Sequence, residues 1–272
     1  MFCPKCGTEI EEGAKFCSKC GMMIDSGIKR RGREEIREAK RKPLSRLAMV
    51  AIIIVVVVVI SGLLSTMFLL GGGHLFGEVV GSGNIITKED QFSDFTEVDA
   101  GSGFTVEISE SGSYDVLVTA DDNVMEYVEV SKSGGTLNVG VRWGISFRSV
   151  TLEIRITMPE INKIELSGGV QGKIEDFTST NQLSIDLSGG SQLTGQGSTG
   201  ELTVDASGGA QLHFADYLVR DAEIELSGGS QATINLDGIL NADLSGGSQL
   251  YYYGNPTLGE IETSSGSQIT KR

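Results

Sequence analysis

The chain has few of the residues on which catalysis usually depends. It contains only two histidines, His74 in a glycine-rich segment and His213 on a predicted strand, so a serine–histidine–aspartate triad has little to work with. No Walker A sequence occurs, no Gly-x-Gly-x-x-Gly sequence precedes a predicted helix, and the calcium-binding repeat G-G-x-G-x-D is absent. Arg220 is the one plausible catalytic base, and an ion pair with Asp216 or Asp221 is its simpler interpretation. We therefore expect a protein that is not an enzyme.

Cysteine is also scarce, and its distribution is informative. All four cysteines lie in the first twenty residues, in the segment C-P-K-C-G-T-E-I-E-E-G-A-K-F-C-S-K-C-G. Two Cys-x-x-Cys-Gly turns supply a closed tetrahedral set of thiolates for a structural Zn²⁺. The alternative, two disulfides or free thiols, is disfavoured in a reducing cytosol. The segment resembles the short zinc-ribbon modules of many microbial membrane proteins. We expect a zinc ribbon over residues 1–21, with Zn²⁺ bound by Cys3, Cys6, Cys17 and Cys20.

Charge of either sign is missing from one long segment. Residues 47–70 are 24 residues without a charged side chain, and as a helix they would be ~36 Å long, enough to cross a hydrocarbon core of ~30 Å. Residues 29–46 hold nine basic side chains against three acidic ones, whereas residues 71–83 hold no lysine or arginine. The positive-inside rule then predicts a transmembrane helix over 47–70 with its N-terminal side in the cytoplasm. A buried helix of a soluble protein is the alternative.

The segments on either side of this helix are predicted to be linkers. The basic residues of 22–46 could bind nucleic acid, but beside a membrane helix they are better explained as a juxtamembrane linker on anionic lipid head groups. Residues 71–81 are a glycine-rich linker on the other side. We therefore expect the lipid bilayer, and no nucleic acid, as a partner of this region.

The C-terminal part repeats the phrase S-G-G-S-Q and its variants. Its glutamine recurs every 18 to 21 residues, which indicates a solenoid. Before each glycine pair the residues alternate between apolar and polar, as in Ile185-Asp186-Leu187-Ser188, and this period of two predicts a half-buried strand. The glycines would turn a corner, and the adjacent Ser and Gln side chains would hydrogen-bond to their copies in neighbouring coils. The glutamines are Gln171, Gln192, Gln211, Gln231, Gln249 and Gln268.

An acidic residue recurs at the same place in each predicted strand. Stacked coils would bring these side chains ~4.8 Å apart in one column, where neighbours repel by ~0.9 kcal/mol even in bulk water. The column is either a solvated face that keeps the sheet soluble or a stripe that binds cations and links to anionic polymers or to a second copy. Its members are Asp99, Glu165, Asp186, Asp205, Glu225, Asp243 and Glu262.

The chain from about Gly81 to Arg272 resembles a known family. The motifs that carry the resemblance are G-S-G-N-I-I-T-K-E-D-Q-F-S-D-F (81–95), G-S-G-F-T-V-E-I (101–108), I-T-M-P-E-I-N-K-I-E-L-S-G-G (156–169) and the SGG repeats. They are similar to the auto-transporter adhesin head domains called GIN domains. The resemblance implies an all-β, right-handed parallel β-helix in the cell envelope, with no established activity. We expect this fold over residues 82–272, with about 20 residues per coil.

Aromatic residues are few, and two groups of them are candidates for a role. Trp143 and Phe147 could form a loop that stacks on sugars, although packing in the core or at the end of the solenoid is the simpler interpretation. Tyr251, Tyr252 and Tyr253 are expected to cover the open end of the solenoid, as terminal repeats must.

Together these patterns predict a single-pass membrane protein with a cytoplasmic zinc ribbon and an extracellular solenoid. The function that fits best is a non-catalytic, adhesin-like binding or scaffolding protein of the cell envelope. Its partner would be an envelope polysaccharide, another envelope protein or a second copy. A transmembrane sensor that signals through the zinc ribbon is the first alternative, and a polysaccharide-active β-helix enzyme is the second.

Overall fold

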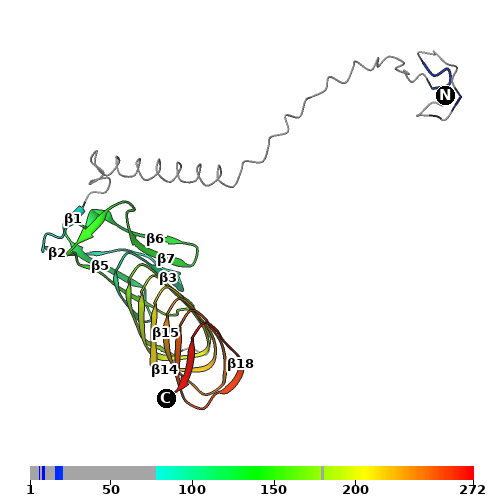
Figure 1. The fold of residues 1–272 in the computed structure, drawn as a ribbon. Helices are drawn as coiled ribbons and strands as arrows, with labels where there is room; N and C mark the ends of the chain where they lie inside the picture. The colour runs from blue at the N-terminus through cyan, green and yellow to red at the C-terminus, as the bar shows by residue number, and fades with distance from the viewer. Residues whose placement is uncertain (1–5, 7, 10–15, 21–77, 179–180) are drawn as a thin grey trace, which may run out of the picture. The chain divides into compact units, whose positions relative to one another are not determined.

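The computed structural model describes residues 6, 8–9, 16–20, 78–178 and 181–272. The chain divides into two units, residues 1–72 and residues 73–272, and each is considered by itself (Figure 1). The predicted basic linker, transmembrane helix and most of the glycine-rich linker (22–46, 47–70 and 71–77) lie outside the described residues. Among the residues that are described, no helix is long and apolar enough to span a bilayer.

The described residues of the second unit form β-strands and one 3-10 turn, η1 (Met125–Tyr127). The strands are β1 (Glu78–Val80), β2 (Ile85–Glu89), β3 (Glu97–Ala100), β4 (Thr105–Glu110), β5 (Asp115–Asp121), β6 (Val128–Ser133), β7 (Thr136–Val141), β8 (Ser146–Arg148), β9 (Leu152–Met158), β10 (Lys163–Leu166), β11 (Gln171–Thr178), β12 (Gln182–Leu187), β13 (Gln192–Ala206), β14 (Gln211–Leu226), β15 (Gln231–Leu236), β16 (Ile239–Leu244), β17 (Gln249–Tyr253), β18 (Thr257–Thr263) and β19 (Gln268–Lys271).

From β10 onward the strands stack in two parallel ladders, as the period of about 20 residues predicts. The first ladder runs β3–β10–β12–β13–β14–β16–β18, and the second runs β4–β11–β13–β14–β15–β17–β19. The long strands β13 and β14 each contribute to both ladders. The sequence prediction of an all-β solenoid is confirmed for this part of the chain, and Figure 1 shows its coils stacked toward the C-terminus.

The apolar residues of the alternating pattern point inward and fill the interior of the coils. In the first ladder an aliphatic side chain of each strand lies over its copy in the next, as Ile164 does over Ile185. All but the last of these side chains are buried, and full burial of one such aliphatic stabilises the fold by ~1.5–3 kcal/mol. The stacked residues are Val98, Ile164, Ile185, Val204, Ile224, Ala242 and Ile261.

The N-terminal end of this unit differs from a continuous parallel coil. Strand β2 pairs with β5, β5 with β9 and β6 with β7, and all three pairings are antiparallel. Strands β7 and β9 also run parallel to β3 and β4, so the coil of β3 and β4 lies between β7/β9 and β10/β11. The prediction of parallel coils over all of 82–272 is therefore too broad. Gly134 and Gly135 form a two-residue turn that reverses the chain between β6 and β7, which accounts for one of the three antiparallel pairings.

Each S-G-G-S corner has two residues in the left-handed region. Gly228 has φ of +61° and Gly229 has φ of +79°. The second serine donates to the carbonyl of the first in the same corner, as Ser230 Oγ does to Ser227 O at 2.7 Å. The expectation that these serines bond to copies in neighbouring coils is therefore wrong. The side chain is buried and satisfies a carbonyl within its own turn instead.

The three consecutive tyrosines lie on β17 and do not close the solenoid. Strands β18 and β19 pair with β16 and β17 and stack beyond them. Tyr252 is half-buried against the core, and the ring of Tyr251 lies 3.8 Å from the guanidinium of Arg272. The final coil, rather than the tyrosine cluster, therefore covers this end of the core.

Candidate functional site

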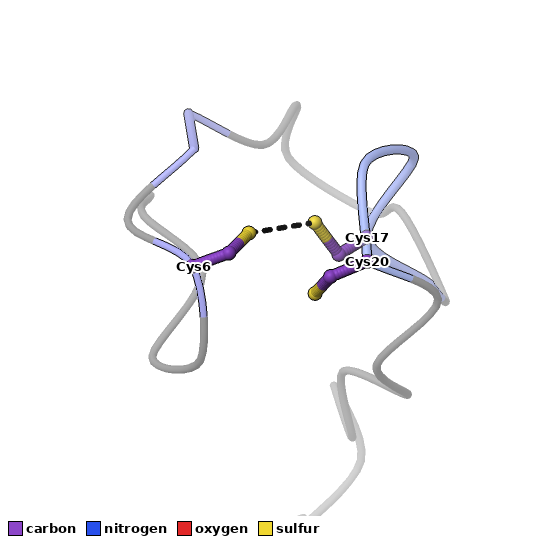
Figure 2. A group of neighbouring side chains, drawn as sticks. All are labelled: Cys6, Cys17 and Cys20. Atoms are coloured by element: carbon purple, nitrogen blue, oxygen red, sulfur yellow. Dashed lines mark hydrogen bonds between the residues drawn. The ribbon is translucent and has the colours of Figure 1, made fainter.

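Three cysteines of the N-terminal unit converge on one point. The Sγ atoms of Cys6, Cys17 and Cys20 all lie within 4.8 Å of one another, and Figure 2 shows the side chains turned toward a common centre. The Cys6 and Cys17 Sγ atoms are 3.6 Å apart, much longer than the ~2.05 Å of a disulfide and close to the separation of two thiolates on one tetrahedral Zn²⁺, whose Zn–S bonds are ~2.3 Å. Cys3, the fourth predicted ligand, lies outside the described residues.

The surroundings of Cys17 favour a thiolate. The backbone N–H groups of Cys20 and then of Lys19 lower the pKa of the Cys17 thiol, and their effect exceeds that of burial, which raises it. Backbone N–H groups aimed at sulfur are what a negatively charged metal–thiolate cluster needs. The donor set therefore fits Zn²⁺, with a structural rather than a catalytic role, because Cys3 would complete four protein ligands and leave no open position.

The predicted column of carboxylates forms on the outer face of the first ladder. The strand register places each acidic residue directly beside the next, from Asp99 opposite Glu165 to Asp243 opposite Glu262. We call this set the acidic column. It consists of Asp99, Glu165, Asp186, Asp205, Glu225, Asp243 and Glu262.

The end of the acidic column nearest β3 is partly neutralised. The Lys163 ammonium forms an ion pair with Glu165 and another, at 2.9 Å, with Asp186. These contacts raise the pKa of Lys163. At Asp99, partial burial and then the Glu165 charge raise the pKa of the carboxyl group. This end of the column is thus less negative than its carboxylate count suggests.

The other end of the acidic column keeps its charge. Glu225, Asp243 and Glu262 are joined by the neighbouring Glu223 and Glu260 around a surface depression of about 250 Å³. None of these five carboxylates forms an ion pair within the described part of the chain. The most negative surface of the first ladder therefore lies on its last three coils.

In the last three coils the outer face of the second ladder is mostly neutral. The predicted glutamines stack in register from Gln171 to Gln268. His213 lies in the adjacent column between Thr194 and Thr233, so its direct neighbours in the ladder are hydroxyl groups rather than carboxylates. The two ladders therefore present faces of different charge.

Arg220 forms an ion pair with Asp221, one of the two aspartates that the sequence predicts as its possible partners. Its Nε donates to Asp221 Oδ2 at 2.8 Å, and both side chains are at the surface. The Asp221 carboxylate also accepts from the backbone N–H of Ile239 at 2.8 Å. Arg220 is thus part of a coil-to-coil contact, and this contact lowers the pKa of Asp221 through its hydrogen bonds from Ile239 and Arg220.

Trp143 and Phe147 do not share one environment. Phe147 packs against the core and lies edge-on to the Tyr127 ring, with 6.0 Å between centroids. Trp143 is 91 % exposed. The expectation that both residues pack in the core or at the end of the solenoid therefore holds for Phe147 and fails for Trp143.

A set of hydrogen bonds that sequence reasoning missed fixes the start of the domain. Residues 82–84 contact residues 121–123, and we call this contact the N-terminal clamp. Asp121 accepts from the N–H groups of Gly83 and Thr151, both at 2.7 Å, although its side chain is almost fully buried. Asp122 accepts from the Ser82 hydroxyl at 2.5 Å. These hydrogen bonds lower the pKa of both aspartates, at Asp121 through Thr151 and then Gly83 and at Asp122 through Ser82 first.

Two solved structures of similar fold are distant from this chain in sequence. A structure described as a "putative adhesin" from Bacteroides fragilis matches with a TM-score of 0.60 at 19% identity, over 71% of this chain and 100% of that chain. A "putative lipid binding protein" from Parabacteroides distasonis matches with a TM-score of 0.48 at 19% identity, over 72% of this chain and 99% of that one. The first likeness supports the fold. A comparison with curated proteins finds no match.

Two family models match separate parts of the chain. The zinc-ribbon domain model matches residues 2–24, which include the cysteine cluster. The model described as "Putative auto-transporter adhesin, head GIN domain" matches residues 94–256, most of the solenoid. With its ladders of strands and its S-G-G-S corners, the chain belongs to the family of auto-transporter adhesin head GIN domains.

Proposed function

We propose that this protein is a single-pass, membrane-anchored, non-catalytic binding or scaffolding protein of the cell envelope. In this proposal residues 47–70 span the membrane, the zinc ribbon is cytoplasmic and the solenoid is extracellular. Zn²⁺ bound by Cys3, Cys6, Cys17 and Cys20 holds the small ribbon together. The coil is right-handed, the hand that parallel crossover connections adopt.

The acidic column is the observation that supports binding by the solenoid. Backbone ladders hold its carboxylates in register at intervals of ~4.8 Å, so they form a line that is already ordered before a partner arrives. Such a line suits an extended partner better than a compact one, because each further coil adds an equivalent contact. In this proposal divalent cations bridge the column to anionic polymers of the envelope.

The last three coils offer the sharpest test of this proposal. The triple variant Glu225→Gln, Asp243→Asn and Glu262→Gln removes three carboxylates from the unneutralised end of the acidic column. The matched control removes three exposed carboxylates outside the column through Glu126→Gln, Glu201→Gln and Asp216→Asn.

The measurement is co-sedimentation of the full-length protein with isolated envelope material, with calcium present or chelated. We expect the column variant to lose most binding and its dependence on calcium, while the control variant retains both. Equal binding by the two variants would contradict a role for the acidic column. Binding that chelation leaves unchanged would contradict the bridging cations.

The N-terminal clamp favours a second candidate function, a transmembrane sensor. The clamp ties the first residues of the domain to the β5–η1 turn through hydrogen bonds at both Asp121 and Asp122. Because the clamp holds these residues rigidly, a force on the solenoid would be transmitted to the linker that precedes β1. Deletion of residues 1–25 separates the two functions, since envelope binding should survive the loss of the ribbon and signalling should not.

A further inference from the structure

The most exposed aromatic side chain of the solenoid lies where the chain joins this unit. Strands β1 and β8 are parallel, with Glu78 opposite Ser146 and Val80 opposite Arg148. Parallel strands begin at the same end of a sheet, so the loop that leads into β8, residues 142–145, lies at the end where the chain arrives at β1. Trp143 is in this loop and is 91 % exposed. We call residues 142–145 the tryptophan loop.

The base of the tryptophan loop is held in place. The Arg142 guanidinium donates to Glu126 O at 3.2 Å and lies 5.7 Å from the centroid of the Tyr127 ring. It also forms an ion pair with Glu129 at 3.5 Å. Gly144, with φ of +88°, completes the turn. The loop therefore projects Trp143 from an anchored base.

Other exposed apolar side chains gather on the first two strands. Val80 of β1 is 51 % exposed, and Ile85 and Ile86 of β2 are 49 % and 43 % exposed. The remaining large exposed apolar residues of the described solenoid lie on separate, later coils, at Leu218, Ile239 and Leu258. Four of the seven large exposed apolar residues of the described solenoid thus lie on β1, β2 and the tryptophan loop.

The reach of the chain limits how far this surface can be from a membrane. Only eight peptide steps separate Leu70, the last residue of the predicted span, from Glu78, and eight residues extend at most ~29 Å. The N-terminal clamp lies just beyond β1 and fixes the direction in which the chain joins the domain. In the proposed topology the start of β1 therefore lies within ~29 Å of the end of the membrane span, and the tryptophan loop lies at this same end of β1 and β8.

We propose that the tryptophan loop is a contact with the lipid bilayer, in which Trp143 enters the interface of the outer leaflet. This inference rests on the proposed membrane anchor. Indole rings prefer this depth because they are apolar with one polar N–H group. The nearby arginines are already paired, Arg142 with Glu129 and Arg148 with Glu78 at 3.1 Å. The contact is therefore apolar rather than electrostatic and changes little with salt.

The chain contains one tryptophan, so its intrinsic fluorescence reports on Trp143 alone. The full-length protein is reconstituted into phosphatidylcholine–phosphatidylglycerol vesicles, with and without phosphatidylcholine brominated in the upper acyl chain. The matched control is the double variant Trp143→Phe and Leu258→Trp, which moves the only indole to an exposed position on β18. The brominated lipid is present in both leaflets, so quenching is the same whether the solenoid lies outside or inside the vesicle.

We expect Trp143 to emit at shorter wavelength than the control and to lose several-fold more fluorescence to brominated lipid, at low and at high salt. Equal emission and equal lack of quenching, in protein that floats with the vesicles, would overturn this contact and leave the anchor standing. A short emission wavelength without lipid quenching would assign the loop to a protein contact and would also overturn it. Protein that does not float with the vesicles would overturn the anchor itself.

Discussion

Gly228 and Gly229 stand side by side in one corner of the solenoid and differ in one physical respect. Both have a left-handed backbone, with φ of +61° and +79°. A Cβ atom added to Gly228 would lie 3.0 Å from Gly208 N and 3.6 Å from Gly208 Cα, whereas one added to Gly229 would meet nothing within 4 Å. Gly208 is the equivalent residue of the preceding coil, so only the first glycine of the pair is crowded by stacking.

The two alanine variants separate the cost of conformation from the cost of stacking. The left-handed conformation costs an L-residue ~1–2 kcal/mol, so both Gly228→Ala and Gly229→Ala should lower the free energy of unfolding by this amount. Overpacking against a neighbour that cannot move adds ~1–3 kcal/mol, and only Gly228→Ala incurs it, because the opposing atoms belong to backbone. For a unit of this size each kcal/mol is worth about 2–4 °C in Tm. We expect Gly228→Ala to melt several degrees below Gly229→Ala.

In the corner of the last coil, a residue with a side chain replaces the first glycine of the pair. Ser265 takes the place of the first glycine there, with φ of +54°. Its coil has a neighbour on one side only, so it can move outward to relieve a close contact. Thermal unfolding of the full-length protein, followed by circular dichroism of the strands, compares the two alanine variants with the parent. Equal losses at both positions would refute the stacking argument, and no loss at either would refute the account of the corners as structural.

Two further predictions concern the metal and the N-terminal clamp. Cys17→Ser should abolish stoichiometric zinc, while Ser18→Ala beside it should not, as measured by metal analysis of the purified protein; zinc retained by Cys17→Ser would contradict the ligand set. The folded-state pKa of Asp121 is lowered, by Thr151 and then by Gly83, so its contribution to stability is present above the unfolded pKa of ~3.9 and is lost as the pH falls through the folded pKa. Asp121→Asn should therefore lower Tm at neutral pH and make Tm less dependent on pH below about pH 5, relative to Glu126→Gln; parallel pH curves for the two variants would argue against the clamp.

The solenoid was predictable because one sequence rule repeats. Each coil needs the same alternation and the same glycine corner, so Ile185 and its copies reveal both the strand and its register. The antiparallel end layer obeys no such repeat. Its turn at Gly134 and Gly135 depends on pairing between β6 and β7, and a glycine pair alone does not distinguish a hairpin from a solenoid corner.

The candidate sites divide in the same way. The cysteine cluster and the acidic column follow from spacing, because a short gap or a fixed period determines which side chains meet. The N-terminal clamp joins residues about 40 positions apart, such as Gly83 and Asp121, and no periodic signal connects them. The exposure of Trp143 was likewise hidden, because an aromatic residue between two strands fits a core position as well as a projecting loop.

The central claim, a cytoplasmic ribbon and an extracellular solenoid, is tested most directly by labelling cysteines in intact cells. All natural cysteines lie in the first twenty residues, so Leu258→Cys places one new thiol on an exposed position of the solenoid. With a membrane-impermeant maleimide, we expect Leu258→Cys to be labelled in intact cells and the parent protein to be labelled only after lysis and removal of metal. Labelling of the parent in intact cells, or protection of Leu258→Cys until lysis, would contradict the account.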